Sequence, residues 1–129
     1  MNRTIFITAA LLGMLSVILG AYAAHGLKEL VSTDLAQSFE TGVKYQMYHA
    51  LMLLFLGSTS VLPYKIKRAI FGLTILGVIF FSGSIYGLVT NEYTTFDFKK
   101  IAFITPIGGA LLIASWTVLL ISFIKNKNQ

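Results

Sequence analysis

The polar side chains best placed to do chemistry lie in residues 39–50, which run directly into the apolar residues 51–62. At about 100° per residue on a helix, Glu40 and Lys44 share one face, and His49 lies on roughly the opposite one. Glu40 and Lys44 form an i, i+4 pair in the favourable order, which predicts a salt bridge in water or among lipid headgroups. Two roles stay open for His49: a hydrogen bond to another helix, or contact with a ligand or a proton.

Composition indicates that these residues belong to a membrane protein. Of the 129 residues, 56% are hydrophobic and 12% are charged, and the mean hydropathy is +0.78. One soluble domain of this size could not bury so much apolar surface, so a lipid-facing exterior is expected. No cysteine is present for a disulfide or a thiolate metal site. The formal charge of +5 does not indicate a nucleic-acid partner, because the basic residues flank apolar runs instead of forming a stripe.

Four apolar segments are each long enough to cross a bilayer. They cover residues 4–24, 43–62, 69–89 and 101–124. At 1.5 Å per residue, each reaches about 30 Å, the thickness of the hydrocarbon core. We therefore predict an all-α integral membrane protein, a four-helix bundle that forms one domain over residues 1–129. The first segment is longer than the apolar core of a signal peptide, so we expect it to be retained.

The connection between the first two segments is more polar and has two interpretations. Residues 32–34, Ser-Thr-Asp, are typical of a helix N-cap. We predict a short amphipathic helix over residues 34–42 that lies at the membrane interface and bends at Gly42 into the second span. The alternative is one uninterrupted helix that tilts out of the membrane.

Charge counts predict the orientation of the chain in the membrane. One side holds both termini and the second connection, and it has no acids. Its six cations are Arg3, Lys65, Lys67, Arg68, Lys125 and Lys127. The other side has four cations and all five acids. Because the connections are short, the positive-inside rule applies, and both termini should face the cytoplasm from a plasma or inner membrane.

This topology gathers scattered polar residues into the outer half of the membrane. His25 lies at the boundary, and the side chains expected within roughly 10 Å below it are Gln46, His49, Ser82, Ser84, Tyr86 and Thr105. An unpaired polar group in hydrocarbon costs several kcal/mol, so these groups should contact one another or line a wet pocket. Adding the interfacial residues Glu40, Lys44 and Tyr45 completes the set that we predict to bind a ligand.

Standard enzyme signatures are absent from the sequence. A metal site would require His25, His49 and Glu40 to converge, because no HExxH spacing is present. Residues 81–85 lack the GxSxG pattern of a serine hydrolase, and no glycine-rich phosphate loop is found. We expect no metal and no cofactor, and we interpret the protein as non-enzymatic. Acid or base chemistry on a lipid, by His25 or His49, is the weaker alternative.

Four sequence blocks in order resemble one family over nearly the whole chain. They are residues 20–27 (GAYAAHGL), 41–51 (TGVKYQMYHAL), 81–86 (FSGSIY) and 105–109 (TPIGG), followed by Trp116. These look like the signature blocks of domain-of-unknown-function family 423, small four-helix membrane proteins of bacteria with mitochondrial and animal relatives. The resemblance implies a four-helix integral membrane fold and carries no assigned activity or catalytic residues.

Two functions remain open on the sequence. The first is a homo-oligomer whose outward-facing pocket binds a lipid headgroup or a small polar molecule, with membrane lipids as its partners. Helices with small-residue faces bury little by themselves, which favours association. The second is a small homo-oligomeric transporter or channel with His49 and Gln46 in its pathway. No carboxylate lies in the middle of a predicted span, which argues against proton-coupled antiport.

Overall fold

The computed structural model describes residues 2–90 and 103–126, and every regular element within these two ranges is helical. The elements are α1 (Asn2–Ala24), α2 (Gly26–Leu30), α3 (Thr33–Ser58), α4 (Tyr64–Val78), η1 (Ile79–Gly83), α5 (Ser84–Val89) and α6 (Ile104–Lys125). Element η1 is a π-helix, whose turns are wider than those of an α-helix. The predicted all-α fold class is confirmed.

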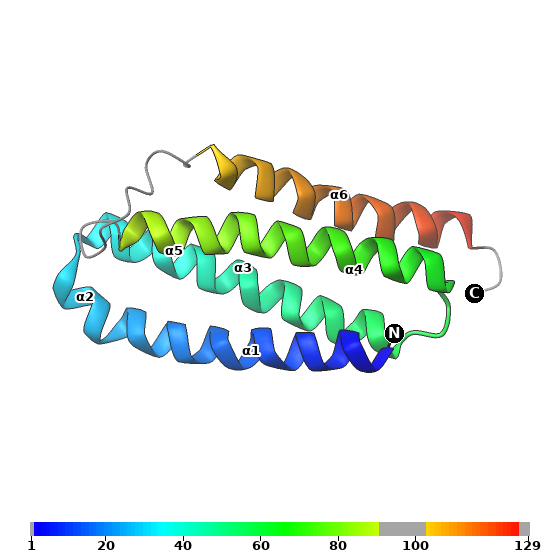
Figure 1. Cartoon of the computed structure of the whole chain (residues 1–129), viewed down its shortest axis with the longest axis horizontal. Coiled ribbons are helices and arrows are strands. Elements are labelled where there is room, and N and C mark those ends of the chain that lie inside the picture. Colours follow the sequence, from blue (N-terminus) through cyan, green and yellow to red (C-terminus); the bar gives the residue numbers. More distant parts are fainter. Residues whose placement is uncertain (1, 91–102, 127–129) are drawn as a thin grey trace.

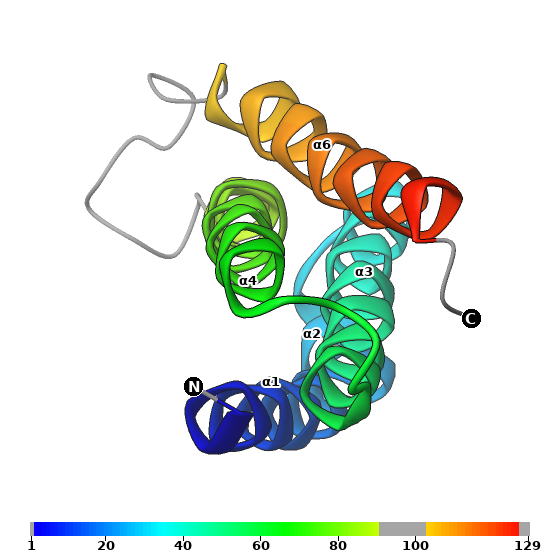
Figure 2. The ribbon, with the colours of Figure 1, turned by 90° about the vertical axis from the view of Figure 1, so that its right-hand side faces the viewer.

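Within the described ranges, four long stretches of helix run along the molecule (Figure 1). Three of them are α1, α3 and α6, and the fourth is the continuous series α4, η1 and α5. α1 packs along α3, while α4 and η1 pack along α6. α3 also contacts α4, η1 and α5, which joins the two pairs. Viewed from the end, α3 and α4 lie between α1 and α6 (Figure 2).

Three helices within the described ranges are long and apolar enough to cross a membrane, and they are Asn2–Ala24, Tyr64–Val89 and Ile104–Lys125. They correspond to the first, third and fourth predicted spans, except that residues 101 and 102 lie outside the described residues. Between 17% and 33% of their most apolar windows is buried inside the protein, so most of each window faces outward. The second predicted span falls in α3, which begins with a polar stretch, and its crossing of the membrane stays a prediction.

The separate helix predicted for residues 34–42 is absent, and α3 instead runs unbroken over Thr33–Ser58. The predicted start is correct, because the Ser32 hydroxyl accepts a hydrogen bond from a first-turn backbone N–H at 3.2 Å. Gly42 does not bend the helix but admits a neighbour, since a Cβ built there would lie 2.9 Å from Cε1 of Tyr86. This glycine therefore allows close packing between α3 and α5.

Buried apolar side chains form two clusters, one toward each end of the long helices. The cluster near the start of α1 and the end of α6 includes Ile5, Leu53, Leu56, Ile70 and Leu119. The cluster at the other end consists of Ala23, Leu27, Phe39 and Val89, with partly buried neighbours. Along α3, Gln46 comes between the residues of the two clusters. A polar layer is therefore placed between two apolar ones.

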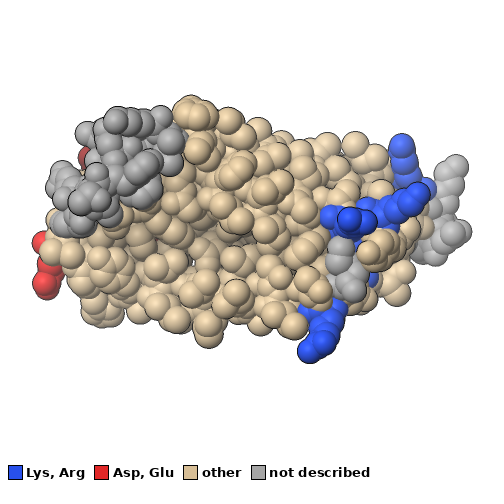
Figure 3. All heavy atoms as spheres, in the orientation of Figure 1, with Lys and Arg blue, Asp and Glu red and all other residues tan. Residues whose placement is uncertain are grey.

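Charged side chains gather at the two ends of the molecule (Figure 3). On the face shown, Lys and Arg cover the end where α1 starts and α6 finishes, and the acids lie at the opposite end. The wide surface between them shows no charge. Large apolar side chains are exposed along the helices, among them Val17 at 64%, Ile113 at 69% and Leu120 at 60%. On this face, the uncharged surface between the two ends matches a hydrocarbon core.

Candidate functional site

Gln46 links three helices near the middle of the molecule. Its Nε2 donates to the Leu12 carbonyl of α1 at 2.9 Å, and its Oε1 accepts from the Tyr86 hydroxyl of α5 at 2.7 Å. The Ser16 hydroxyl donates to the same Leu12 carbonyl at 2.8 Å. Gln46 is 4% exposed, so these bonds are shielded from the surroundings. We call Leu12, Gln46 and Tyr86 the Gln46 junction.

Two serines near the π-helix reach different neighbours. Ser82 donates to the Gly42 carbonyl of α3 at 2.7 Å. The Ser84 hydroxyl is hydrogen-bonded to the Thr105 hydroxyl of α6 at 2.5 Å. Residues two apart on a helix point to nearly opposite sides, so this short segment binds α3 on one side and α6 on the other. Both serines therefore join helices.

His49 connects α3 to α6 through Trp116. The indole Nε1–H donates to Nε2 of His49 at 3.0 Å, and Nδ1 of His49 lies 2.6 Å from the Tyr45 carbonyl. Since an indole nitrogen is a donor only, Nε2 must be the acceptor and Nδ1 must carry the proton that is donated to Tyr45. Both ring nitrogens of this neutral, 3% exposed imidazole thus have partners. Of the two predicted roles, the geometry shows the hydrogen bond to another helix.

Replacing His49 by leucine should shift the fluorescence of Trp116 to shorter wavelength. Trp116 is the only tryptophan of the chain, so the emission reports on one indole. Its N–H loses its acceptor in the variant, and a hydrogen bond stabilises the polar excited state of the ring more than its ground state. Thr117→Val, which removes a hydroxyl bonded within α6, should leave the emission unchanged. An identical spectrum for His49→Leu and the native protein would contradict the bond between the two rings.

The remaining predicted site residues lie at the surface. His25, Glu40 and Lys44 are exposed, and Tyr45 is 40% exposed. Nδ1 of His25 lies 2.9 Å from the carbonyl of Ala21 on its own helix. The ten predicted residues therefore divide into two groups. Those that bond helices together are buried or half-buried, and they are Gln46, His49, Ser82, Ser84, Tyr86 and Thr105. The other four are exposed. That they bind a ligand stays a prediction.

A pocket of about 330 Å³ opens beside the exposed group, where α1 ends and α3 begins. Its lining consists of Ala23, Ala24, Lys28, Thr33, Ala36, Gln37 and Glu40. We call it the Lys28–Glu40 pocket after its two charged residues. A neighbouring hollow shares Ala24 and Lys28 with it and adds His25, Gly26 and Glu29. Of the predicted set, His25 and Glu40 are the members that line this region.

The buried polar atoms of the described ranges are all engaged. Every buried side-chain nitrogen and oxygen in residues 2–90 and 103–126 has a hydrogen-bond partner. Within the same residues, no three His, Asp or Glu side chains come together in a group that holds a metal ion. The buried polar side chains therefore use their donors and acceptors within the protein, whereas the Lys28–Glu40 pocket has charged groups that a ligand can reach.

Residues 19–109 match the model of a family described as a protein of unknown function (DUF423). The chain belongs to this family. A UPF0382 membrane protein of Staphylococcus haemolyticus is 40% identical over 95% of this chain and 97% of its own length. The Escherichia coli UPF0382 inner membrane protein YgdD is 30% identical over 99% of this chain and 95% of its own length. No solved structure matches the chain.

Membership of DUF423, together with the three apolar helices, makes this a membrane protein. The matched range contains Gln46 and His49 but begins after Leu12 and ends before Trp116. Leu12, one partner of Gln46, and Trp116, one partner of His49, therefore lie outside the matched range, whereas Tyr86, the other side chain bonded to Gln46, lies inside it. These two bonds tie residues of the matched range to the parts of α1 and α6 that lie outside it.

Two residues of the site were missed by the sequence prediction. Trp116 is not among the predicted site residues. An indole N–H in an apolar segment is a donor that needs an acceptor, and this requirement is the signal that could have paired Trp116 with His49. Lys28 is the other missed residue, because in the sequence it is only one of the four cations on the side that holds the acids. The short helix α2 places Lys28 beside Glu40, and five residues are too few for a periodic pattern to reveal that turn.

Proposed function

We propose that this DUF423 protein is a non-enzymatic membrane protein that binds a zwitterionic lipid headgroup in the Lys28–Glu40 pocket. The observation that carries the proposal is that a cation and an anion line one pocket where α1 ends and α3 begins. In a membrane protein, lipid is the ligand present at the highest concentration around a surface pocket of this kind. The pocket is built from α1, α2 and α3.

The chemistry of the lining fits a headgroup that has both signs of charge. The ammonium of Lys28 would pair with the lipid phosphate, and the carboxylate of Glu40 would pair with the lipid ammonium. Ala23, Ala24 and Ala36 provide small apolar walls that leave room for the glycerol region. Ion pairs of exposed side chains contribute up to about 1 kcal/mol each, which corresponds to up to about fivefold in affinity.

The proposal places this pocket on the outer side of the membrane. The end that carries the predicted cluster of cations is the opposite one, and the positive-inside rule assigns it to the cytoplasm together with both termini. α3 connects the end of α1 to the start of α4, and these lie at opposite ends of the molecule (Figure 1). A crossing by α3 would therefore complete a four-span path.

The hydrogen bonds that Gln46 and His49 make to other helices favour a binding function over a transport function. Gln46 and His49, the residues proposed for a transport pathway, are each bonded to another helix. A solute that passed them would have to break these bonds. A binding site at the surface requires no such change.

Native mass spectrometry of the full chain from mild detergent tests the headgroup proposal. Phosphatidylethanolamine added to the native protein should be retained, and Lys28→Ala or Glu40→Gln should lower its retention by up to about fivefold. Asp34→Asn removes another exposed acid of α3 that does not line the pocket, so this control should retain the lipid. The same spectra give the subunit count, which tests the proposed homo-oligomer.

Two outcomes would contradict the headgroup site. One is equal retention of phosphatidylethanolamine by the native protein and both pocket variants. The other is an equal loss in Asp34→Asn, which would point to a general effect of surface charge. Circular dichroism of each variant shows whether the fold is intact.

A further inference from the structure

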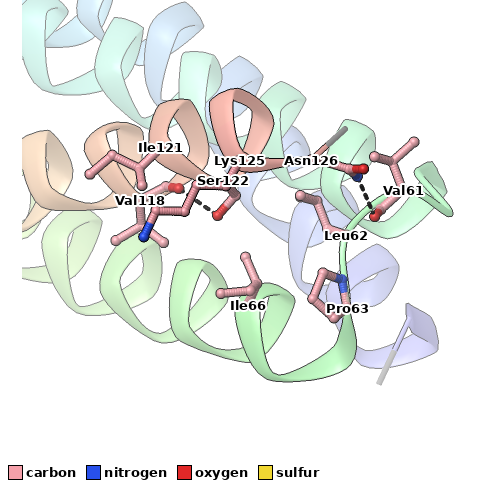
Figure 4. Close-up of a pocket in the computed structure, with 9 residues that line it drawn as sticks. All are labelled: Val61, Leu62, Pro63, Ile66, Val118, Ile121, Ser122, Lys125 and Asn126. Atoms are coloured by element: carbon pink, nitrogen blue, oxygen red, sulfur yellow. Dashed lines mark hydrogen bonds between the residues drawn. The ribbon is translucent and has the colours of Figure 1, made fainter. Parts of the chain in front are cut away.

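A second pocket lies at the opposite end of the molecule, between the end of α6, the start of α4 and the connection from α3 (Figure 4). Its volume is about 480 Å³, within the range of about 300–1,000 Å³ that is usual for small-molecule sites. Its apolar lining includes Leu62, Pro63, Ile66, Val118 and Ile121. Figure 4 shows side chains of the two helices and of the connection facing one another. This lining suits a hydrocarbon chain.

One cation belongs to this apolar pocket. Lys125, in the last turn of α6, is exposed and is the charged residue of its lining. Arg3, Lys65 and Arg68 are exposed at the same end, where Figure 3 shows the gathering of Lys and Arg. The pocket thus combines apolar walls with a positively charged rim.

No acid offsets these cations in the first turn of α4. Lys67, in this part of α4, is 6% exposed, and its Nζ donates to the neutral Oδ1 of Asn2 at 3.2 Å. The start of a helix is also its positive end, where further cations are disfavoured. An anion bound beside the pocket would lower this electrostatic cost, because the Asp and Glu side chains among the described residues all lie in α2 and the first part of α3.

We propose that this pocket binds an anionic phospholipid, with an acyl chain along the apolar walls and the phosphate at Lys125. The inference goes beyond the headgroup proposal, because it concerns the other end of the molecule and a different class of lipid. A free inorganic anion would leave the apolar walls unused. A zwitterionic headgroup would find no acid among the lining residues to pair with its ammonium.

The test is lipid retention by the full chain in mild detergent, measured by native mass spectrometry. The probes are phosphatidylglycerol, phosphatidylethanolamine and inorganic phosphate. Each basic residue near a membrane surface contributes about fivefold to the affinity for anionic lipid. Lys125→Gln should therefore lower phosphatidylglycerol retention about fivefold, and Lys125→Arg should preserve it. Ser38→Asp changes the net charge by the same amount at the other end and should preserve retention.

A second variant tests the apolar wall without changing any charge. Ile121 is 44% exposed and lines the pocket, so Ile121→Trp should fill the pocket and lower phosphatidylglycerol retention while thermal unfolding stays unchanged. Retention that remains native in Ile121→Trp would overturn the proposal. So would displacement of phosphatidylglycerol by an equal concentration of inorganic phosphate, or an equal loss in Ser38→Asp and Lys125→Gln.

The two lipid proposals fail independently. Loss of phosphatidylethanolamine binding in Lys28→Ala concerns only the α2 end of the molecule. Phosphatidylglycerol retention in the same variant should remain native, because Lys28 does not line the α4 and α6 pocket. If Lys28→Ala lowers phosphatidylglycerol retention as much as Lys125→Gln does, the assignment to the α4 and α6 pocket is wrong.

Discussion

A single methyl group added at Gly108 should lower the free energy of unfolding by about 3 kcal/mol, the upper part of the range for overpacked sites. A Cβ built at Gly108 would lie 2.6 Å from the backbone carbon of Phe80 and closer still to the backbone nitrogen of Phe81. Both atoms belong to the π-helix η1, and backbone atoms cannot rotate away as a flexible side chain can. Gly108→Ala should therefore push α6 away from η1.

Two other glycines provide matched controls for Gly108→Ala. A Cβ at Gly83, which lies in the π-helix itself, or at Gly72 of α4 would meet nothing within 4 Å. Alanine at these helical positions should be neutral or should stabilise the protein by up to about 1 kcal/mol. Thermal unfolding in detergent, followed by circular dichroism, compares the three variants. Equal stabilities for Gly108→Ala and Gly83→Ala would contradict the close contact between α6 and η1.

The helices were predictable because lipid permits few alternatives. Within hydrocarbon every backbone N–H and C=O must be bonded inside its own segment, so long apolar runs have to be helical. The predicted start at residue 4 is close to the observed start of α1 at Asn2. α4 begins earlier than predicted, at Tyr64, because Pro63 fits the position before a helix and the cations that follow it are compatible with helical structure.

The packing of the helices was not predictable from one sequence. A glycine that bends a helix and a glycine that admits a neighbour look alike, and Gly42 was assigned the wrong one of these roles. The π-helix over Ile79–Gly83 has no local signal in its residue types. The π-helix packs closely against Gly108 of α6, which is far away in the sequence, so the residues around the π-helix do not reveal this contact.

The candidate site was predicted in part, because depth in the membrane groups residues from different helices. Ser84 and Thr105 were assigned to one layer and are bonded to each other. His49 lies about 24 Å along α3 from Thr33 at 1.5 Å per residue, and it is bonded to Trp116. Trp116 is a partner that the predicted layer did not include.

Gln46→Leu should lower the free energy of unfolding by about 1–3 kcal/mol. Leucine keeps most of the buried volume but leaves the Tyr86 hydroxyl without its acceptor and removes one donor from the Leu12 carbonyl. The cost is limited at Leu12, because Ser16 still donates to that carbonyl. The measurement is thermal unfolding in detergent, as for the glycine variants.

Gln37→Leu is the matched control for Gln46→Leu, because it makes the same change at an exposed position of the same helix. It should alter stability by less than about 0.5 kcal/mol. Tyr86→Phe completes a double-mutant cycle: since the hydroxyl acts through Gln46, the double variant should lose less than the sum of the single losses, by about 0.6–1.7 kcal/mol. Additive losses would show that Gln46 and Tyr86 stabilise the protein independently. They would contradict a stabilising hydrogen bond between these two side chains.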